Sequence, residues 1–351
     1  METPRPRSNL RPALPPRMSS KALLQAVFSS KKPLLPNPRR SPSITSLNSS
    51  TSTRSSSSAS SHRDTPESTS RIRTRSSSET RKSYHILNNI PAVSAAAWCI
   101  MEAHTGHVVY GHCDIEPREI ASLTKIMTCY VVLKLLAKTD KVTMDSVIKV
   151  SEKAASMIGT SAELKGGDEI TVKDILHGLM LPSGNDAAWA LAEFLGSFLN
   201  PNSSKPVSHF LSEMNKTARE LGLDNTSYGN PHGLIYKRNL STARDVCKLA
   251  SVAMKDETFR GIVGTKIYTA DIWNNGERRE KTWENTNKLL NKGFEGVKTG
   301  VTNKAGPCLC ASFKKDTRMI VVLLNSKSMD ARWIEAKKLV EWGTVKYSCK
   351  P

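Results

Sequence analysis

The chain has 351 residues, of which 38% are hydrophobic, and a formal net charge of +19. A chain of this length can bury the core of one large domain or two smaller ones. The charge is uneven, because residues 1–82 hold 16 of the 51 basic residues but four of the 32 acidic ones, which places +12 there and +7 in the remainder. Phe28 is the only aromatic residue of this basic stretch, so it lacks the stacking side chains of a nucleic-acid-binding segment, and we expect no nucleic-acid partner.

Residues 1–83 are predicted to be a disordered tail. Between residues 41 and 80, 24 of 40 positions are Ser or Thr, and such a stretch cannot bury enough apolar surface to offset its chain entropy. Two interpretations remain open: an organellar transit peptide, which is also rich in Arg and Ser, or a regulatory tail. We see no secretory signal and no transmembrane segment, since no apolar run approaches the length needed, and we expect a soluble protein with an ordered region at 84–351.

The ordered region is expected to begin with a β-hairpin and a buried helix. Val93–Met101 is apolar and favours a strand, Val108–Tyr110 follows it, and Gly106 lies in the turn between them. Residues 122–138 follow with apolar side chains almost all round the predicted helix. A helix that is apolar on most faces is usually buried.

Helices dominate the middle of the chain and strands return at its end. After a loop-rich stretch with short strands at 140–171, the sequence predicts helices at 171–181, 186–198, 208–221 and 242–254, then strands at 308–313 and 318–324 and a closing helix at 330–347. Strands at both ends that meet in one sheet, with helices between, make an α+β fold: an antiparallel sheet flanked by helices, with a helical subdomain at roughly 140–260.

The seven cysteines predict neither a disulfide framework nor a metal site. Their number is odd and their spacing irregular, and no second Cys pair or suitable His cluster accompanies Cys308 and Cys310. These two thiols should share one buried face of a strand. We therefore predict no metal and no cofactor.

A serine and a lysine at the start of the buried helix have the spacing of a nucleophile and its base. Ser122 and Lys125 form one of four Ser-x-x-Lys spacings in the chain, but this one opens the long apolar helix, where three-residue spacing puts both side chains on one face. The free N–H groups of a helix start favour negative charge on the serine oxygen. Burial would lower the lysine pKa and make it a base. The alternative for Lys125 is a solvated surface lysine.

Two further polar segments could complete such a site. Ser183-Gly184-Asn185 follows Pro182 between two helices, and Lys298-Thr299-Gly300 leads into the final strands. Each has an ordinary alternative, a helix–helix turn for the first and a surface turn for the second. As parts of a site, Ser183 would relay a proton, Asn185 would bond to substrate or to Lys125, and the lysine and threonine would hold a carboxylate, while Gly300, without a Cβ, would let substrate approach.

The motifs together resemble one family. Ala121–Thr128, Pro182–Ala188, Asn230–Leu234, Ser241–Asp245 and Gly296–Thr302 are similar, in this order, to segments of the D-alanyl-D-alanine carboxypeptidases, the low-molecular-mass penicillin-binding proteins. The resemblance covers about residues 90–347. It implies a DD-peptidase/β-lactamase-like fold with the site at the junction of the sheet and an all-helical subdomain.

The resemblance also implies the chemistry. Peptides ending in D-Ala-D-Ala would be the substrates, β-lactams would be covalent inhibitors, and an acyl-enzyme would form on the nucleophile. By this resemblance the catalytic residues are Ser122, Lys125 and Ser183, and the substrate-binding residues are Asn185, Lys298, Thr299, Gly300, Val301 and Arg332. The backbone N–H groups of Ser122 and Val301 would form the oxyanion hole.

Three other functions remain open at this point. A class A β-lactamase shares the fold, but the nearest candidate for its deacylating glutamate, Glu284, lies too close to Lys298 in sequence. An amidase or esterase could keep the site and act on another substrate. A non-catalytic scaffold could keep the fold alone.

Overall fold

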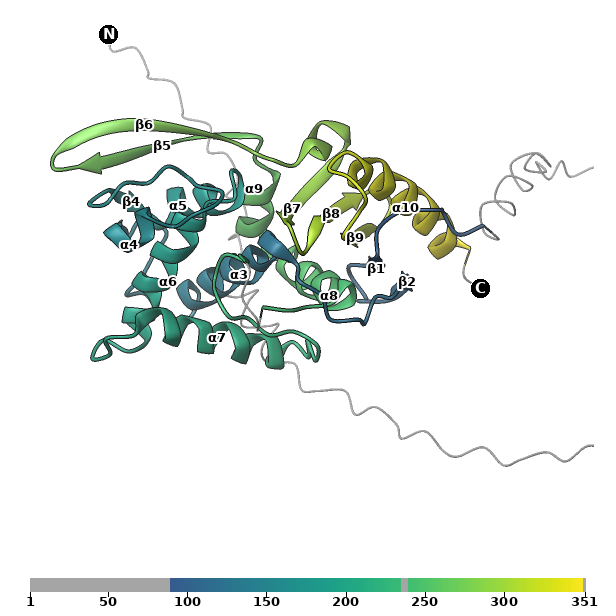
Figure 1. Ribbon diagram of the computed structural model, residues 1–351, viewed down its shortest axis with the longest axis horizontal. Coiled ribbons are helices and arrows are strands. Elements are labelled where there is room, and N and C mark those ends of the chain that lie inside the picture. Colours follow the sequence, from purple (N-terminus) through teal and green to yellow (C-terminus); the bar gives the residue numbers. More distant parts are fainter. Residues whose placement is uncertain (1–88, 235–238, 350–351) are drawn as a thin grey trace, which may run out of the picture.

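The computed structural model describes residues 89–234 and 239–349 (Figure 1). The predicted tail at 1–83 and the predicted start of order at Tyr84 lie outside these ranges. Within them, no helix combines the length and the apolar character that crossing a bilayer would require.

A five-stranded antiparallel sheet joins the two ends of the described chain. Its strand order is β2-β1-β9-β8-β7, and the strands are β1 (Ala97–Glu102), β2 (Val108–His112), β7 (Phe294–Thr302), β8 (Gly306–Lys314) and β9 (Arg318–Leu324). Cys99 of β1 pairs with Val322 of β9, so the expectation that terminal strands meet in one sheet is confirmed.

Alternation along the strands gives the sheet two buried faces. On one face, Cys99, Cys308 and Cys310 belong to the core shared with the helices, and both predicted strand thiols are fully buried there. On the other, Ile100 and Val321 pack with residues of α10 (Ala331–Ser348). Figure 1 shows α10 along the outer side of this sheet. The two-residue period of a strand accounts for this division.

The long apolar helix is buried at the centre, as predicted. It is α3 (Thr124–Leu136), which contacts the sheet through β7 and the helices on its other side. Ser122, however, lies in a separate 3-10 turn, η1 (Ala121–Leu123), before α3 begins. The backbone of Ala121 is left-handed, with φ of 48°, which prevents the α-helix from extending back through it.

The remaining helices lie where the sequence places them, with two additions. The predicted four are α5 (Val172–Met180), α6 (Asn185–Leu199), α7 (Pro206–Glu220) and α8 (Ala243–Ala253); the two that were not predicted are α4 (Glu152–Ala155) and α9 (Glu257–Gly264). The hydroxyls of Thr171 and Thr242 accept N-cap hydrogen bonds at α5 and α8. Gly222 follows the end of α7 with φ of +62°, as expected for a C′ glycine.

A second sheet was not predicted, although two of its strands fall in the stretch at 140–171 where short strands were expected. It has the order β3-β4-β5-β6, from β3 (Val147–Lys149), β4 (Glu169–Thr171), β5 (Ile267–Asn274) and β6 (Glu277–Glu284), and a short 3-10 helix, η2 (Lys288–Lys292), follows it. Figure 1 shows β5 and β6 as a long hairpin over β4 and α5. Asn275-Gly276, both with positive φ, form its turn. This dipeptide is a strong hairpin signal, but the charged sequence of β6 obscured the strand pattern.

Candidate active site

The two residues expected to be nucleophile and base, Ser122 and Lys125, lie in η1 and at the start of α3, where both elements contact β7. Lys125 is in the first turn of α3, and its Nζ atom lies 3.0 Å from Oγ of Ser122. The lysine side chain is fully buried. The three-residue spacing predicted this proximity for two side chains on one helix face, although the turn that carries Ser122 is the 3-10 turn η1 and not α3.

Lys125 has two further hydrogen-bond partners, and both can only accept. They are Oδ1 of Asn185, at 2.7 Å, and the backbone carbonyl of His232, at 2.8 Å. The amide of Asn185 is held in this orientation because its Nδ2 donates to the carbonyl of Ile158 at 2.7 Å. A neutral Lys125 amine has two N–H bonds, and these two acceptors fix both of them. The lone pair of its nitrogen then faces Ser122.

The surroundings also favour the neutral amine. Burial lowers the pKa of Lys125 well below its usual value, and the positive charge of Lys298 lowers it further, while Asp186 opposes the shift. His232 adds no charge, because burial, followed by the charge of Lys125, lowers its pKa to about 3. A neutral amine beside a serine hydroxyl can accept the hydroxyl proton.

The loop that supplies the His232 carbonyl is a part of the site to which the sequence assigned no role. Gly233 has φ of +90°, and a Cβ there would lie 2.0 Å from the carbonyl oxygen of Ala121. Thr128 of α3 donates to the carbonyl of Pro231 at 2.6 Å. The loop is thus fastened to η1 and α3. The sequence signal was the Asn-Pro-His-Gly segment, but a backbone acceptor cannot be identified from residue types.

The segment around Ser183 is held by a buried carboxylate. Asp186 accepts hydrogen bonds from the Ser161 hydroxyl and from the backbone N–H groups of Ala162, Leu164 and Ala187. Ser183 itself has φ of 71°, and its buried Oγ has no hydrogen-bond partner among the described residues. A free hydroxyl on a strained backbone is typical of functional sites.

Strand β7 brings the third segment against the nucleophile. A Cβ on Gly300 would lie 3.0 Å from the backbone nitrogen of Ser122 and 3.1 Å from the carbonyl oxygen of Ile120. The sequence explained this glycine by the approach of substrate, but the structure shows the chain's own backbone in that space. The next residue, Val301, is 48% exposed.

Two buried basic residues lie at this strand: Lys298, which belongs to β7, and Arg332 of α10. Lys298 is fully buried, and burial, then the charge of Arg332, lowers its pKa to about 7. Arg332 donates to the carbonyls of Gly300 and Cys308, at 3.2 and 3.0 Å, and burial lowers its pKa to about 10. In the described ranges, neither cation forms an ion pair with a carboxylate. Uncompensated buried positive charge favours an anionic ligand.

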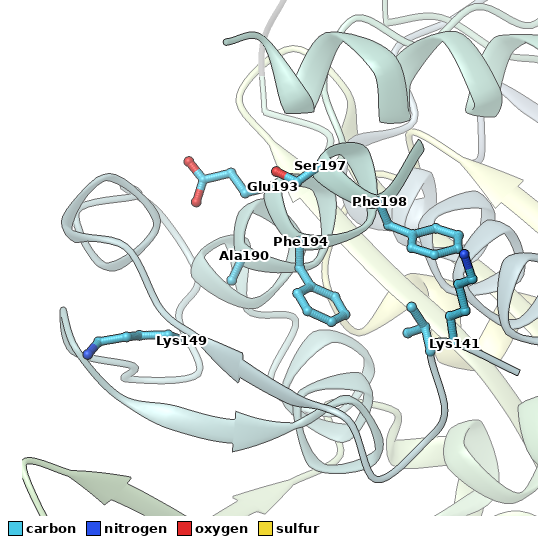
Figure 2. Close-up of a pocket in the computed structure, with 8 residues that line it drawn as sticks. Lys141, Lys149, Ala190, Glu193, Phe194, Ser197 and Phe198 are labelled. Carbon is cyan, nitrogen blue, oxygen red and sulfur yellow. The ribbon is translucent and has the colours of Figure 1, made fainter. Parts of the chain in front are cut away.

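A separate groove lies along α6, away from these residues. It has a volume of about 540 Å³, and Figure 2 shows Phe194 and Phe198 in it, with Lys141 and Lys149 at the sides. Glu193 in its lining already accepts hydrogen bonds from Ser151 and Trp189. None of the motif residues lines this groove.

Comparison with known proteins identifies relatives along most of the chain. The family model described as D-alanyl-D-alanine carboxypeptidase, peptidase S11, matches residues 85–328. The chain is 37% identical over 264 residues to D-alanyl-D-alanine carboxypeptidase DacF of Bacillus subtilis, which covers 74% of this chain and 64% of DacF. It is 36% identical to the D-alanyl-D-alanine carboxypeptidase of Streptomyces sp. strain K15, over 72% of this chain and 88% of that protein.

Solved structures show the same likeness. The Streptomyces K15 DD-transpeptidase superposes with a TM-score of 0.68 at 37% identity, over 73% of this chain and 99% of that chain. D-alanyl-D-alanine carboxypeptidase DacD from Francisella tularensis superposes with a TM-score of 0.63 at 29% identity, over 72% of this chain and 70% of that chain.

Proposed function

The chain belongs to the peptidase S11 family of D-alanyl-D-alanine carboxypeptidases, and on this basis we propose that it is a serine-type carboxypeptidase that acts on peptides ending in D-Ala-D-Ala. The observation that carries the proposal is the environment of Lys125. Its Nζ atom has acceptors fixed at Asn185 and His232, so that the remaining direction faces Ser122 Oγ at 3.0 Å.

Acylation begins with proton transfer from the Ser122 hydroxyl to the neutral amine of Lys125. The serine oxygen attacks the carbonyl carbon between the last two D-alanines, and the N–H groups of Ser122 and Val301 stabilise the oxyanion. The C–N bond then breaks, and the leaving amine takes the proton that Lys125 received, relayed through Ser183, whose Oγ has no partner among the described residues. D-Alanine leaves and an ester remains on Ser122.

Lys298, Thr299 and Arg332 select the substrate end. The charge of the two cations attracts the terminal carboxylate, and the Thr299 hydroxyl donates to it. This end of the peptide is lost as D-alanine. Water then attacks the ester, Lys125, neutral again, takes a proton from this water, and the same proton returns to Ser122 Oγ as the ester bond breaks.

The test is stereoselective release of alanine by the full chain. We expect release from an acetylated peptide ending in D-Ala-D-Ala and none from its L,L counterpart. A fluorescent penicillin should label Ser122 and persist, whereas rapid turnover of the penicillin would indicate a β-lactamase. Failure of both labelling and alanine release would contradict the proposal and favour the scaffold alternative.

A second candidate reaction of the same acyl-enzyme is transfer of the acyl group to an amine. The superposed Streptomyces K15 structure is named a DD-transpeptidase. In this reaction an acceptor amine attacks the same ester in place of water, and an amide forms. Adding glycine or a D-amino acid to the assay and measuring the ratio of transfer product to hydrolysis product separates the two reactions.

A further inference from the structure

A threonine outside the three motifs contacts the motif threonine directly. Oγ1 of Thr286 lies 2.8 Å from Oγ1 of Thr299, in the segment between β6 and η2. Thr286 is exposed, whereas Thr299 is 7% exposed. Thr286 thus lies at the rim of the site, beside the hydroxyl that is aimed at the substrate carboxylate.

Hydrogen bonds from Thr286 and from the preceding residue, Asn285, fix the position of Thr286. Its own N–H donates to the carbonyl of Leu181 at 3.1 Å, two residues before Ser183. The side-chain amide of Asn285 donates to the carbonyls of Val263 and Thr265, at 3.2 and 2.9 Å. Thr286 therefore bridges the segment that leads to Ser183 and the strand that carries Thr299.

Each of the two threonine hydroxyls has one proton, and this limits how they can be arranged. Thr286 can donate to the Leu181 carbonyl, at 3.3 Å, and accept from Thr299. In that state Thr299 has no proton for a substrate. If Thr286 instead donates to Thr299, the Thr299 proton is free for a carboxylate. In this second arrangement the Leu181 carbonyl still accepts a hydrogen bond from the Thr286 backbone N–H. Rotation of the Thr286 hydroxyl therefore leaves no buried acceptor without a donor.

Resting on the proposed function, we propose that Thr286 is a positioning residue that turns the Thr299 hydroxyl toward the terminal carboxylate of the substrate. When the carboxylate binds, Thr299 donates to it, and Thr286 rotates to donate to Thr299. The two bonds form a chain in which each strengthens the other. Thr286 thereby sets affinity for a free carboxyl terminus without touching the scissile bond.

The test uses Thr286→Val, which keeps the shape of the side chain and removes the hydroxyl, and Thr286→Ser, which keeps the hydroxyl. For a D-Ala-D-Ala peptide we expect Thr286→Val to raise KM about 3- to 10-fold, equivalent to one neutral hydrogen bond, with kcat changed less than about twofold. Thr286→Ser should restore KM. The effect on KM should vanish with the C-terminal carboxamide of the same peptide, which lacks the carboxylate.

A matched control lies four residues earlier in the chain, on the β5–β6 hairpin. Thr282 of β6 bonds to Thr269 through an equivalent hydroxyl pair, also 2.8 Å apart, and Thr282→Val should leave KM and kcat unchanged. An unchanged KM in Thr286→Val, or a loss that Thr286→Ser does not restore, would overturn the inference. The second-order rate constant of acylation by penicillin can be compared among the same variants. If the wild-type protein is acylated by penicillin but does not cleave the peptide, the proposed substrate is contradicted. The acylation rates of the Thr286 variants still test the inference in that case.

Discussion

The Cα atom of Gly300 lies so close to Ser122 that a Cβ built on it would be 3.0 Å from the serine's backbone nitrogen. The third motif is thus in van der Waals contact with the first at the atom that is proposed to bind the oxyanion. Strand β7 and turn η1 cannot separate or approach without moving this N–H group.

We therefore expect Gly300→Ala to impair catalysis more than stability. The added methyl group must push β7 from η1, and a displacement of this kind costs about 10- to 100-fold in kcat/KM. Gly261→Ala in α9 is the control, because a Cβ there meets nothing within 4 Å. Steady-state kinetics and thermal unfolding of both variants check this. Full activity in Gly300→Ala would show that the contact is not needed.

Ser122→Ala should abolish acylation and leave the fold intact. The substitution removes the only atom proposed to form the ester, while η1 keeps its backbone. Labelling by a fluorescent penicillin should disappear, and the midpoint of thermal unfolding should stay within about 3 °C of the wild type. Labelling at the wild-type level would refute the assignment of the nucleophile.

The pH dependence should be set on its alkaline side by Lys298. Its pKa of about 7 means that the free enzyme loses this positive charge above neutral pH. Above this pKa we expect kcat/KM to fall about tenfold per pH unit. The fall in kcat should occur at higher pH, because a bound carboxylate raises the pKa of Lys298 in the enzyme–substrate complex.

Lys298→Arg is the matched variant for this prediction. Its guanidinium stays charged throughout the accessible range, so the alkaline limb of kcat/KM should move upward even where the maximal rate is lower. A limb that is the same in both proteins would assign it to another group, and a flat profile from pH 6 to 9 would contradict the role of charge in binding.

Asp186→Asn should destabilise the protein through the loop that covers α6. The carboxylate accepts from four donors, including three backbone N–H groups, and an amide can replace it only in part. We expect a loss of about 2–3 kcal/mol in the free energy of unfolding, measured by urea denaturation. Asp224→Asn, at an exposed position outside the site, should be near neutral. Equal effects of the two substitutions would be inconsistent with this role.

Residue types and order were enough to predict the central helix, the closing sheet and the three polar segments. Periodicity identifies buried faces, and Ser122 with Lys125 has a spacing that only a helical turn brings together. The β5–β6 hairpin was not predicted, because β6 is charged on both faces and lacks the alternation of a half-buried strand. Asn275-Gly276 was nevertheless a recognisable turn signal.

Other parts of the site depend on the path of the backbone and could not be predicted. The acceptor that His232 offers to Lys125 is a carbonyl, which every residue has. The partner of Thr299 is a threonine 13 positions away, in a segment without a recognisable pattern. The neighbour of Gly300 proved to be Ser122 itself. Each of these contacts is set by how distant segments pack.

Lys125, the proposed base, donates its hydrogen bonds to Asn185 and His232, which lie 60 and 107 positions further along the chain. In a nascent or denatured chain, the same lysine is an ordinary hydrated ammonium beside an inert alcohol. Formation of the tertiary structure is therefore the step that activates this pair. The fraction of molecules labelled by an acylating probe then measures the fraction that is folded. Loss of labelling on heating reports unfolding around Ser122.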